Sequence, residues 1–142
     1  MTAQTTTEPR TAGRSRGRGL NITLWVVQIL LAAFFLVAAA VPKLMGEATA
    51  VEMFSVIGLG QWFRYFVGIV ELAGAIGLVI PRLSGLAATG LVLTMIGAVI
   101  TSLTVLDAGA LTLTPALLGI VAALIAWGRW PQTKSLATIV RR

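Results

Sequence analysis

A single carboxylate, Glu71, lies in the middle of an apolar run over residues 62–80, where it could bind a polar group or carry a proton. The run is long enough to cross a bilayer. An acid near the bilayer centre costs roughly 2.5 to 3.5 kcal/mol on insertion scales, so such residues usually face a protein interior and are functional candidates. Gly68, Gly74 and Ala75 share its helical face, and small residues let other helices approach closely. We therefore expect neighbouring helices to shield Glu71.

Four further polar residues are candidates for a cluster with Glu71. Helical side chains lean toward the N-terminus of their own helix, so Lys43, at the outer end of the first expected helix, should converge with Glu71 on the second. Arg64 precedes Glu71 by two helical turns and is the rival partner. With the hydroxyls of Thr101 and Ser102, these residues are predicted to form one polar cluster in the outer half of a bundle. The alternative is that Glu71 is a structural acid, hydrogen-bonded to a neighbour.

The composition restricts the class of protein before any motif is considered. Of 142 residues, 57% are hydrophobic and only 11% are charged, which is typical of an integral membrane protein. Cysteine and histidine are absent, which excludes disulfides, thiolate or imidazole metal sites and histidine-based triads. We expect no metal site, and no catalysis by this chain alone. Because the basic residues lie in tails and at the ends of apolar runs, we expect no nucleic-acid binding.

The apolar runs predict an all-α fold, an integral membrane up-and-down four-helix bundle. Its helices are expected over residues 22–41, 62–80, 84–106 and 113–130. The connection over residues 42–61 should hold a short interfacial helix, on which Ala48, Val51 and Phe54 recur at helical spacing. The alternative is that this helix packs over the mouth of the bundle. Residues 1–20 are expected to be a disordered basic tail, residues 21–130 the transmembrane domain, and residues 131–142 a second basic tail.

Two features predict contacts between helices. One is a stripe of small and weakly polar residues on the third expected helix, typical of a helix that packs closely in a membrane, made of Ala87, Gly90, Thr94, Gly97 and Thr101. The other is the amide of Gln28, which is predicted to hydrogen-bond between helices rather than to bind a ligand.

The basic residues predict the orientation of the bundle. Nine of them fall on one side of the expected membrane, namely Arg10, Arg14, Arg16, Arg18, Arg82, Arg129, Lys134, Arg141 and Arg142. Only Lys43 and Arg64 fall on the other side. Because positive loops and tails stay in the cytoplasm, both termini are predicted to be cytoplasmic in a multi-pass protein of the bacterial inner membrane.

Short ordered motifs resemble those of the DoxX family, specifically its DoxX-like branch. They follow the basic tail and are Pro42-Lys43-Leu44, Gly58-Leu59, Gly68-Ile-Val-Glu71 and Pro81-Arg82, and the resemblance covers about residues 24–128. It implies a small four-helix bacterial membrane protein, in a family with links to quinone reduction and to oxidoreductase complexes of oxidative stress. Lys43 and Glu71 occupy the family's characteristic basic and acidic positions. Ser102 stands where many members have histidine, so the role of that histidine does not carry over.

Three classes of function agree with these observations. The first prediction is a non-catalytic membrane subunit or scaffold for a soluble or membrane oxidoreductase partner. The alternative is a protein that binds a quinone or another lipophilic molecule between its helices through Glu71 and Lys43. The third is a small transporter or proton path through Glu71, which a four-helix protein would support only as a homo-oligomer.

Overall fold

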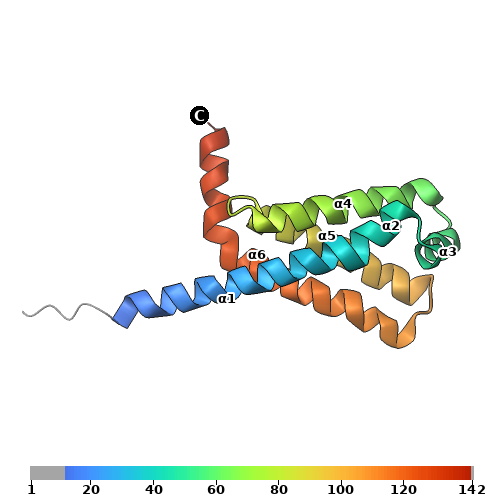
Figure 1. Cartoon of the computed structure of the whole chain (residues 1–142), viewed down its shortest axis with the longest axis horizontal. Coiled ribbons are helices and arrows are strands. Elements are labelled where there is room, and N and C mark those ends of the chain that lie inside the picture. Colours follow the sequence, from blue (N-terminus) through green and yellow to red (C-terminus); the bar gives the residue numbers. More distant parts are fainter. Residues whose placement is uncertain (1–11, 142) are drawn as a thin grey trace, which may run out of the picture.

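The computed structural model describes residues 12–141, with side chains from Gly17 to Arg141. The described chain is all-helical, and four of its helical segments are long and apolar enough to cross a membrane: Gly17–Met45, Gln61–Val79, Ser84–Thr104 and Gly109–Val140. They run alternately up and down as a four-helix bundle (Figure 1). The predicted fold class is confirmed.

The first span consists of three helical pieces in sequence. α1 (Ala12–Phe34) continues into a π-helical turn, η1 (Phe35–Ala40), and then into the short α2 (Val41–Met45). Pro42 has no N–H to donate to the carbonyl group four residues before it, and a wider turn is one way in which a helix adapts to a proline. Gly46, with φ at 74°, then ends α2 in the left-handed conformation that glycine adopts without strain. The first span is therefore longer than the predicted helix over residues 22–41.

The short helix predicted between the first two spans is α3 (Ala48–Ile57), at the end of the bundle. Phe54 is its buried residue, while Glu52 and Met53 on other faces are exposed. α3 therefore has the amphipathic character predicted for an interfacial helix, and it also takes the alternative position over the mouth of the bundle.

The remaining helices begin close to their predicted positions. α4 (Gln61–Val79) and α5 (Ser84–Thr104) agree with the prediction within two residues, because Gly60 and Pro81 interrupt the helical pattern. After the 3₁₀ turn η2 (Gly109–Thr112), α6 (Leu113–Val140) continues ten residues beyond its predicted end at Trp130. Its C-terminal part, red in Figure 1, turns away from the bundle axis. Pro131 lies within this helix, and prolines are the usual cause of a helix bend.

The bounds of both predicted tails need correction. Residues 12–20 belong to α1, and residues 131–140 belong to α6, so both segments are helical where tails were expected. Helices in proteins gain most of their stability from packing and continuity with a neighbouring turn, which a polar composition alone does not show. Residues 1–11 and Arg142, which complete the predicted tails, lie outside the described residues.

The core lies between α1, α4, α5 and α6. Its buried apolar residues form one cluster, which includes Leu31, Phe35, Ala75, Leu78, Ala88, Leu91, Met95, Ala122 and Ile125. Small residues on α4 allow this packing. A Cβ atom at Gly74 would lie 2.5 Å from Cδ2 of Leu91, and one at Gly77 would lie 2.6 Å from Cβ of Ala87. The predicted close approach of helices at Gly74 is confirmed. The stripe predicted on α5 is not packed at Gly90 and Gly97, where a Cβ atom would meet nothing within 4 Å.

We expect Gly74→Ala to destabilise the bundle by about 1 to 3 kcal/mol, because the new methyl group overlaps Leu91 in a packed core. Gly90→Ala is the matched control, since a Cβ there meets nothing within 4 Å and alanine raises helix propensity. Thermal unfolding in detergent micelles measures both variants. Equal stability of the two would show that the contact between α4 and α5 is looser than described.

Candidate functional site

The site is organised around an ion pair between the first and second spans. Nζ of Lys43, on α2, lies 2.8 Å from Oε2 of Glu71 on α4 and donates a hydrogen bond of 3.1 Å to Oε1. The Glu71 side chain is 3% exposed and that of Lys43 is 19% exposed. Gly68 makes the approach possible, since a Cβ there would lie 3.2 Å from Cβ of Lys43. The structure therefore brings together the two charges that helix geometry predicted to converge.

The π-helical turn contributes to the position of Lys43. Its Nζ also donates to the carbonyl oxygen of Ala39, at 3.3 Å. Ala39 belongs to η1, where the wider turn changes the normal pattern of backbone hydrogen bonds. The ammonium group is thus held between a carboxylate on α4 and a carbonyl on its own helix.

Arg64 does not compete for Glu71, although it was the rival partner. Its Nη1 donates to the carbonyl oxygen of Lys43, and its Nε donates to Oε1 of Gln61 at 2.7 Å. The residue is only 4% exposed. Arg64 therefore satisfies a carbonyl near the C-terminal end of α2, which is a common role for a cation at a helix C-terminus, and it fixes the backbone that carries Lys43.

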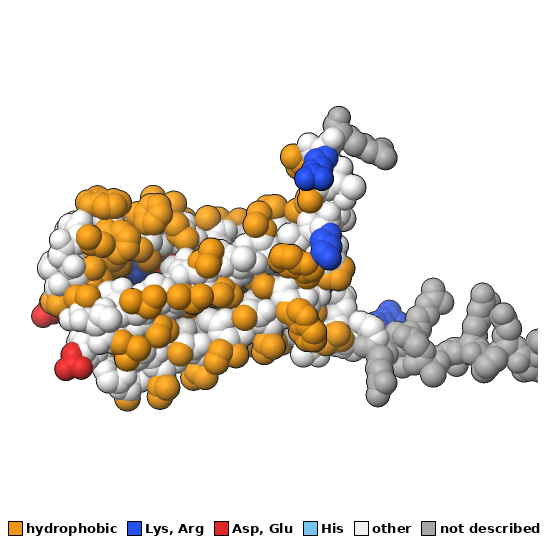
Figure 2. All heavy atoms as spheres, turned by 180° about the vertical axis from the view of Figure 1, so that it is seen from behind, with side chains coloured by type: hydrophobic (Ala, Val, Ile, Leu, Met, Phe, Trp, Pro, Cys, Tyr) orange, Lys and Arg blue, Asp and Glu red, His pale blue; other side chains and the backbone are white. Residues whose placement is uncertain are grey.

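A cavity of about 480 Å³ lies beside the ion pair, with Lys43 in its wall. Its lining comes from all the spans and from α3, and it is mostly apolar, with an aromatic group consisting of Phe34, Phe35, Phe54, Phe63 and Phe66. Figure 2 shows a hollow with hydrophobic side chains around it and a basic side chain visible inside. The volume is within the usual range of small-molecule sites.

The predicted hydroxyl groups line this cavity but are not bonded to the ion pair. Thr101 and Ser102 are both lining residues on α5. Oγ1 of Thr101 donates to the carbonyl oxygen of Gly97, at 2.9 Å, as threonines within helices commonly do. The single cluster of five residues is therefore not formed: Lys43, Thr101 and Ser102 lie along the cavity, whereas Glu71 and Arg64 are behind its wall.

Comparison with known families identifies the family of the chain. The model of the DoxX-like family matches residues 26–125, which is most of the chain. The chain belongs to the DoxX-like family. The resemblance found in the sequence is confirmed. Searches of curated proteins and of solved structures give no significant match.

This DoxX-like protein has a second buried polar cluster, which the sequence analysis did not predict as a whole. At the other end of the bundle, Nε of Arg129 donates to Oε1 of Gln28 at 2.6 Å, and Nη1 donates to Oδ1 of Asn21 at 2.7 Å. Nε2 of Gln28 donates to the carbonyl oxygen of Leu78 at 2.7 Å, and the Trp25 ring lies 5.3 Å from the guanidinium carbon. Gln28 joins helices as predicted. Asn21 and Gln28 are two helical turns apart on α1 and so lie on one face of it. This spacing was the signal in the sequence for a polar partner such as Arg129.

Glu47 caps the start of α3 and makes a contact that depends on pH. The carboxylate of Glu47 accepts hydrogen bonds from the backbone N–H groups of Thr49 at 3.2 Å and Ala50 at 3.3 Å. The hydrogen bond from the Thr49 backbone is the main reason that the pKa of Glu47 is lowered from its usual value. Because the pKa of Glu47 is lower in the folded state, its ionised carboxylate stabilises the folded protein at pH values above the ordinary glutamate pKa. This stabilisation is lost as the pH falls through the pKa of Glu47 in the folded state.

We expect the backbone amides of α3 to exchange with solvent faster as the pH is lowered from the ordinary glutamate pKa through the pKa of Glu47 in the folded protein. The rates are compared after correction for the intrinsic exchange rate at each pH. Protonation of Glu47 weakens its cap on Thr49 and Ala50. The same experiment on Glu47→Gln should show little pH dependence, because the amide does not titrate. Hydrogen exchange with mass spectrometry measures both, and an identical pH response of the two proteins would contradict the assignment.

Proposed function

We propose that this DoxX-like protein binds a lipophilic small molecule in the cavity between its helices, with Lys43 and Glu71 as the polar anchor. The observation that supports it is the apolar cavity of about 480 Å³ whose wall contains the paired Lys43. Ligands of helix bundles are commonly held by core side chains of facing helices. A quinone, expected from the family resemblance, remains one prediction for this ligand, because its carbonyl oxygens could accept a hydrogen bond from Lys43.

The hollow lies on a face that is rich in hydrophobic side chains (Figure 2). In a bilayer such a face contacts lipid tails, where lipophilic molecules concentrate. A ligand could therefore enter the cavity sideways from the membrane rather than from water. This route suits a molecule with an apolar body and one polar group.

Filling the cavity tests the proposal. Gly97 lines it, and a Cβ there meets nothing within 4 Å, so Gly97→Leu should fit while occupying ligand space. Gly90→Leu is the matched control, because Gly90 is on the same helix, has equally open surroundings and is not a lining residue. We expect solvent extraction and mass spectrometry to find a bound lipophile with wild type and Gly90→Leu, and to find it depleted in Gly97→Leu. Absence from all three would contradict the proposal.

A second candidate is the membrane subunit or scaffold of an oxidoreductase system. It is favoured by the open surroundings of Gly90, between the exposed Leu86 and Leu93 on α5. Small residues of this kind let a helix of another protein approach. Here Gly90→Leu should abolish co-purification of an oxidoreductase in mild detergent, and Gly97→Leu should keep it. The same pair of variants thus separates the two functions.

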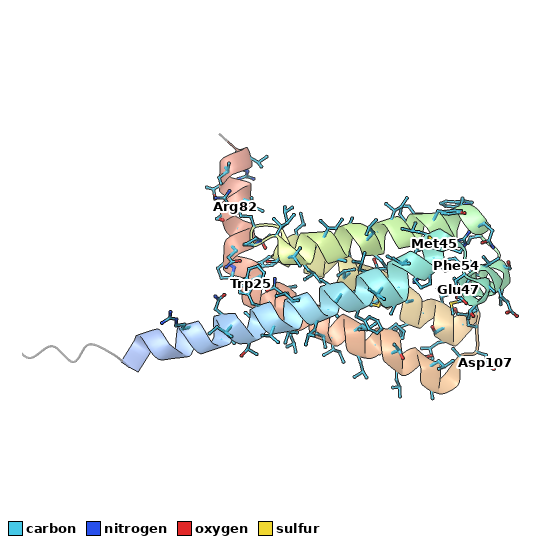
Figure 3. The ribbon with its side chains drawn as sticks, viewed as in Figure 1. Trp25, Met45, Glu47, Phe54, Arg82 and Asp107 are labelled. Atoms are coloured by element: carbon cyan, nitrogen blue, oxygen red, sulfur yellow. The ribbon has the colours of Figure 1, made fainter. Side chains whose placement is uncertain are left out.

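We also propose that the protein lies in the bacterial inner membrane with both termini in the cytoplasm. Figure 3 places Glu47 and Asp107 at one end of the bundle and Arg82 and Trp25 at the other. This separation of charge supports the orientation, because basic residues stay on the cytoplasmic side.

Reporter fusions test the orientation. We expect a fusion after Arg142 to be active only with a cytoplasmic reporter, and one inserted near Glu52 only with a periplasmic reporter. The reverse pattern at either position would contradict the proposed topology.

A further inference from the structure

The polar residues beside the cavity carry an unbalanced positive charge. Among the residues whose side chains are described, Lys43 and Glu71 form the only ion pair. Arg64 is buried next to them, and its hydrogen-bond partners, Gln61 and the carbonyl oxygen of Lys43, are neutral. Two cations and one anion therefore leave one net positive charge in this part of the interior. Buried charges are normally paired, so the imbalance calls for an explanation.

The other acidic side chains near this end do not correct the imbalance. Glu47, Glu52 and Asp107 are exposed to solvent. Glu47 is also engaged in capping α3. Charges on the exposed surface are screened by water and salt, whereas Arg64 and Lys43 act across a medium of lower dielectric constant. The potential inside the cavity is therefore expected to be positive.

Lys43 presents this charge to the cavity. Of the groups in the cluster, it is the cation that lines the cavity, and its contact with the Ala39 carbonyl is long at 3.3 Å. An oxygen atom of a ligand could take over this weak hydrogen bond while the contact with Glu71 is kept. Arg64 would strengthen the interaction between Lys43 and the ligand in two ways. It holds the backbone of Lys43 in place through the Lys43 carbonyl oxygen, and it adds a second positive charge nearby.

We infer that the ligand is a lipophilic acid, an amphiphile with a carboxylate that binds at Lys43 and an apolar body that fills the aromatic part of the cavity. The inference rests on the proposed function and narrows its ligand class. A neutral molecule such as a quinone or an ester can accept a hydrogen bond from Lys43 but does not balance the charge. A carboxylate adds a direct charge–charge attraction to the ammonium group of Lys43, and this attraction is stronger in the cavity than in water because the dielectric constant is lower.

A matched pair of probes tests the charge of the ligand. The protein is placed in phosphatidylcholine nanodiscs, and a fluorescent long-chain carboxylic acid is displaced by its non-fluorescent analogue or by the methyl ester of that analogue. Both competitors are expressed as mole fractions in the lipid, with empty nanodiscs as the blank. At neutral pH we expect the acid to bind about tenfold more tightly than the ester, because only the acid adds a charge–charge attraction to Lys43. Equal binding would overturn the inference and leave the proposed function standing, whereas binding of neither would overturn both.

Three variants locate the effect. Lys43→Met should remove the preference for the acid, and Arg64→Gln should reduce it. In Lys43→Met the ester loses one hydrogen bond but keeps its apolar contacts, so the ester binding that remains in both variants shows that the cavity is intact. Lys134→Gln removes an exposed positive charge on the C-terminal part of α6 and should keep the full preference. If Lys43→Met does not fold, Arg64→Gln alone decides. A preference unchanged in Arg64→Gln, or lost equally in Lys134→Gln, would overturn the inference.

Discussion

Replacing Lys43 with methionine should lower the free energy of unfolding by about 3 to 5 kcal/mol, the range for breaking a buried ion pair by removing one partner. The main cost is at Glu71, which is 3% exposed and would lose its ion-pair partner, while the nearby Arg64 stays bonded to Gln61 and to a backbone carbonyl oxygen. Methionine retains most of the apolar stem of lysine, so lost packing contributes little. Unfolding of the reconstituted protein, measured by thermal or denaturant titration, gives the difference directly.

The double variant Lys43→Met with Glu71→Leu is the control. Replacing both members of a buried pair by apolar residues is often neutral or stabilising, so it should recover most of the lost stability. Glu71→Gln alone should be milder than Lys43→Met, because the amide oxygen can still accept the hydrogen bond from Lys43. Together with the single variants Lys43→Met and Glu71→Leu, the double variant completes a double-mutant cycle. Contacting charges should give a coupling energy of about 0.5 to 3 kcal/mol in this cycle. Purely additive effects would contradict the contact between these two side chains.

The ion pair was predictable because it depends on local helix geometry. Lys43 ends one span and Glu71 lies within the next, and the lean of helical side chains toward the N-terminus sets both directions. The limits of α4 and α5 were predictable for a similar reason, since Gly60 and Pro81 act on their own backbone. Features that depend on one or two neighbouring turns can be inferred from a single sequence.

The cavity was not predictable, because it depends on how eight helical elements are placed relative to one another. The π-helical turn η1 contributes Ala39 to the wall, α2 contributes Lys43, and α3 adds Phe54 at the end of the bundle. The sequence placed Thr101 and Ser102 on the correct region of α5. It did not show that empty space, rather than contact, lies between them and the ion pair.

Arg129 illustrates a different limit of the sequence. It follows the apolar run of α6 and has the position of a topology signal, but the structure buries it against α1. A basic residue at the end of a span can contribute both to orientation and to packing. The decision depends on whether a neighbouring helix offers acceptors, as Asn21 and Gln28 do.

Replacing Gln28 with leucine should destabilise the bundle by about 2 to 4 kcal/mol, which makes this the second largest effect expected. Gln28 is fully buried and makes two hydrogen bonds, one from Arg129 and one to the carbonyl oxygen of Leu78. Bonds to charged groups are worth about 1.5 to 3 kcal/mol and neutral bonds about 0.5 to 1.5 kcal/mol. The total exceeds the ~0.6 kcal/mol average for hydrogen bonds between membrane helices because Arg129 is charged.

The loss would be made worse by the state of the guanidinium group that remains. Nη2 of Arg129 is already buried without a hydrogen-bond partner among the described residues, and leucine would leave Nε unpaired as well. Asn21→Ala is the matched control: it removes the other acceptor of Arg129, but Asn21 is exposed, so water can replace it. Gln28→Glu should lie between the two, since it keeps an acceptor for Arg129 and loses the donor to Leu78. Thermal unfolding that ranks Gln28→Leu level with Asn21→Ala would show that the buried cluster does not hold α1, α4 and α6 together.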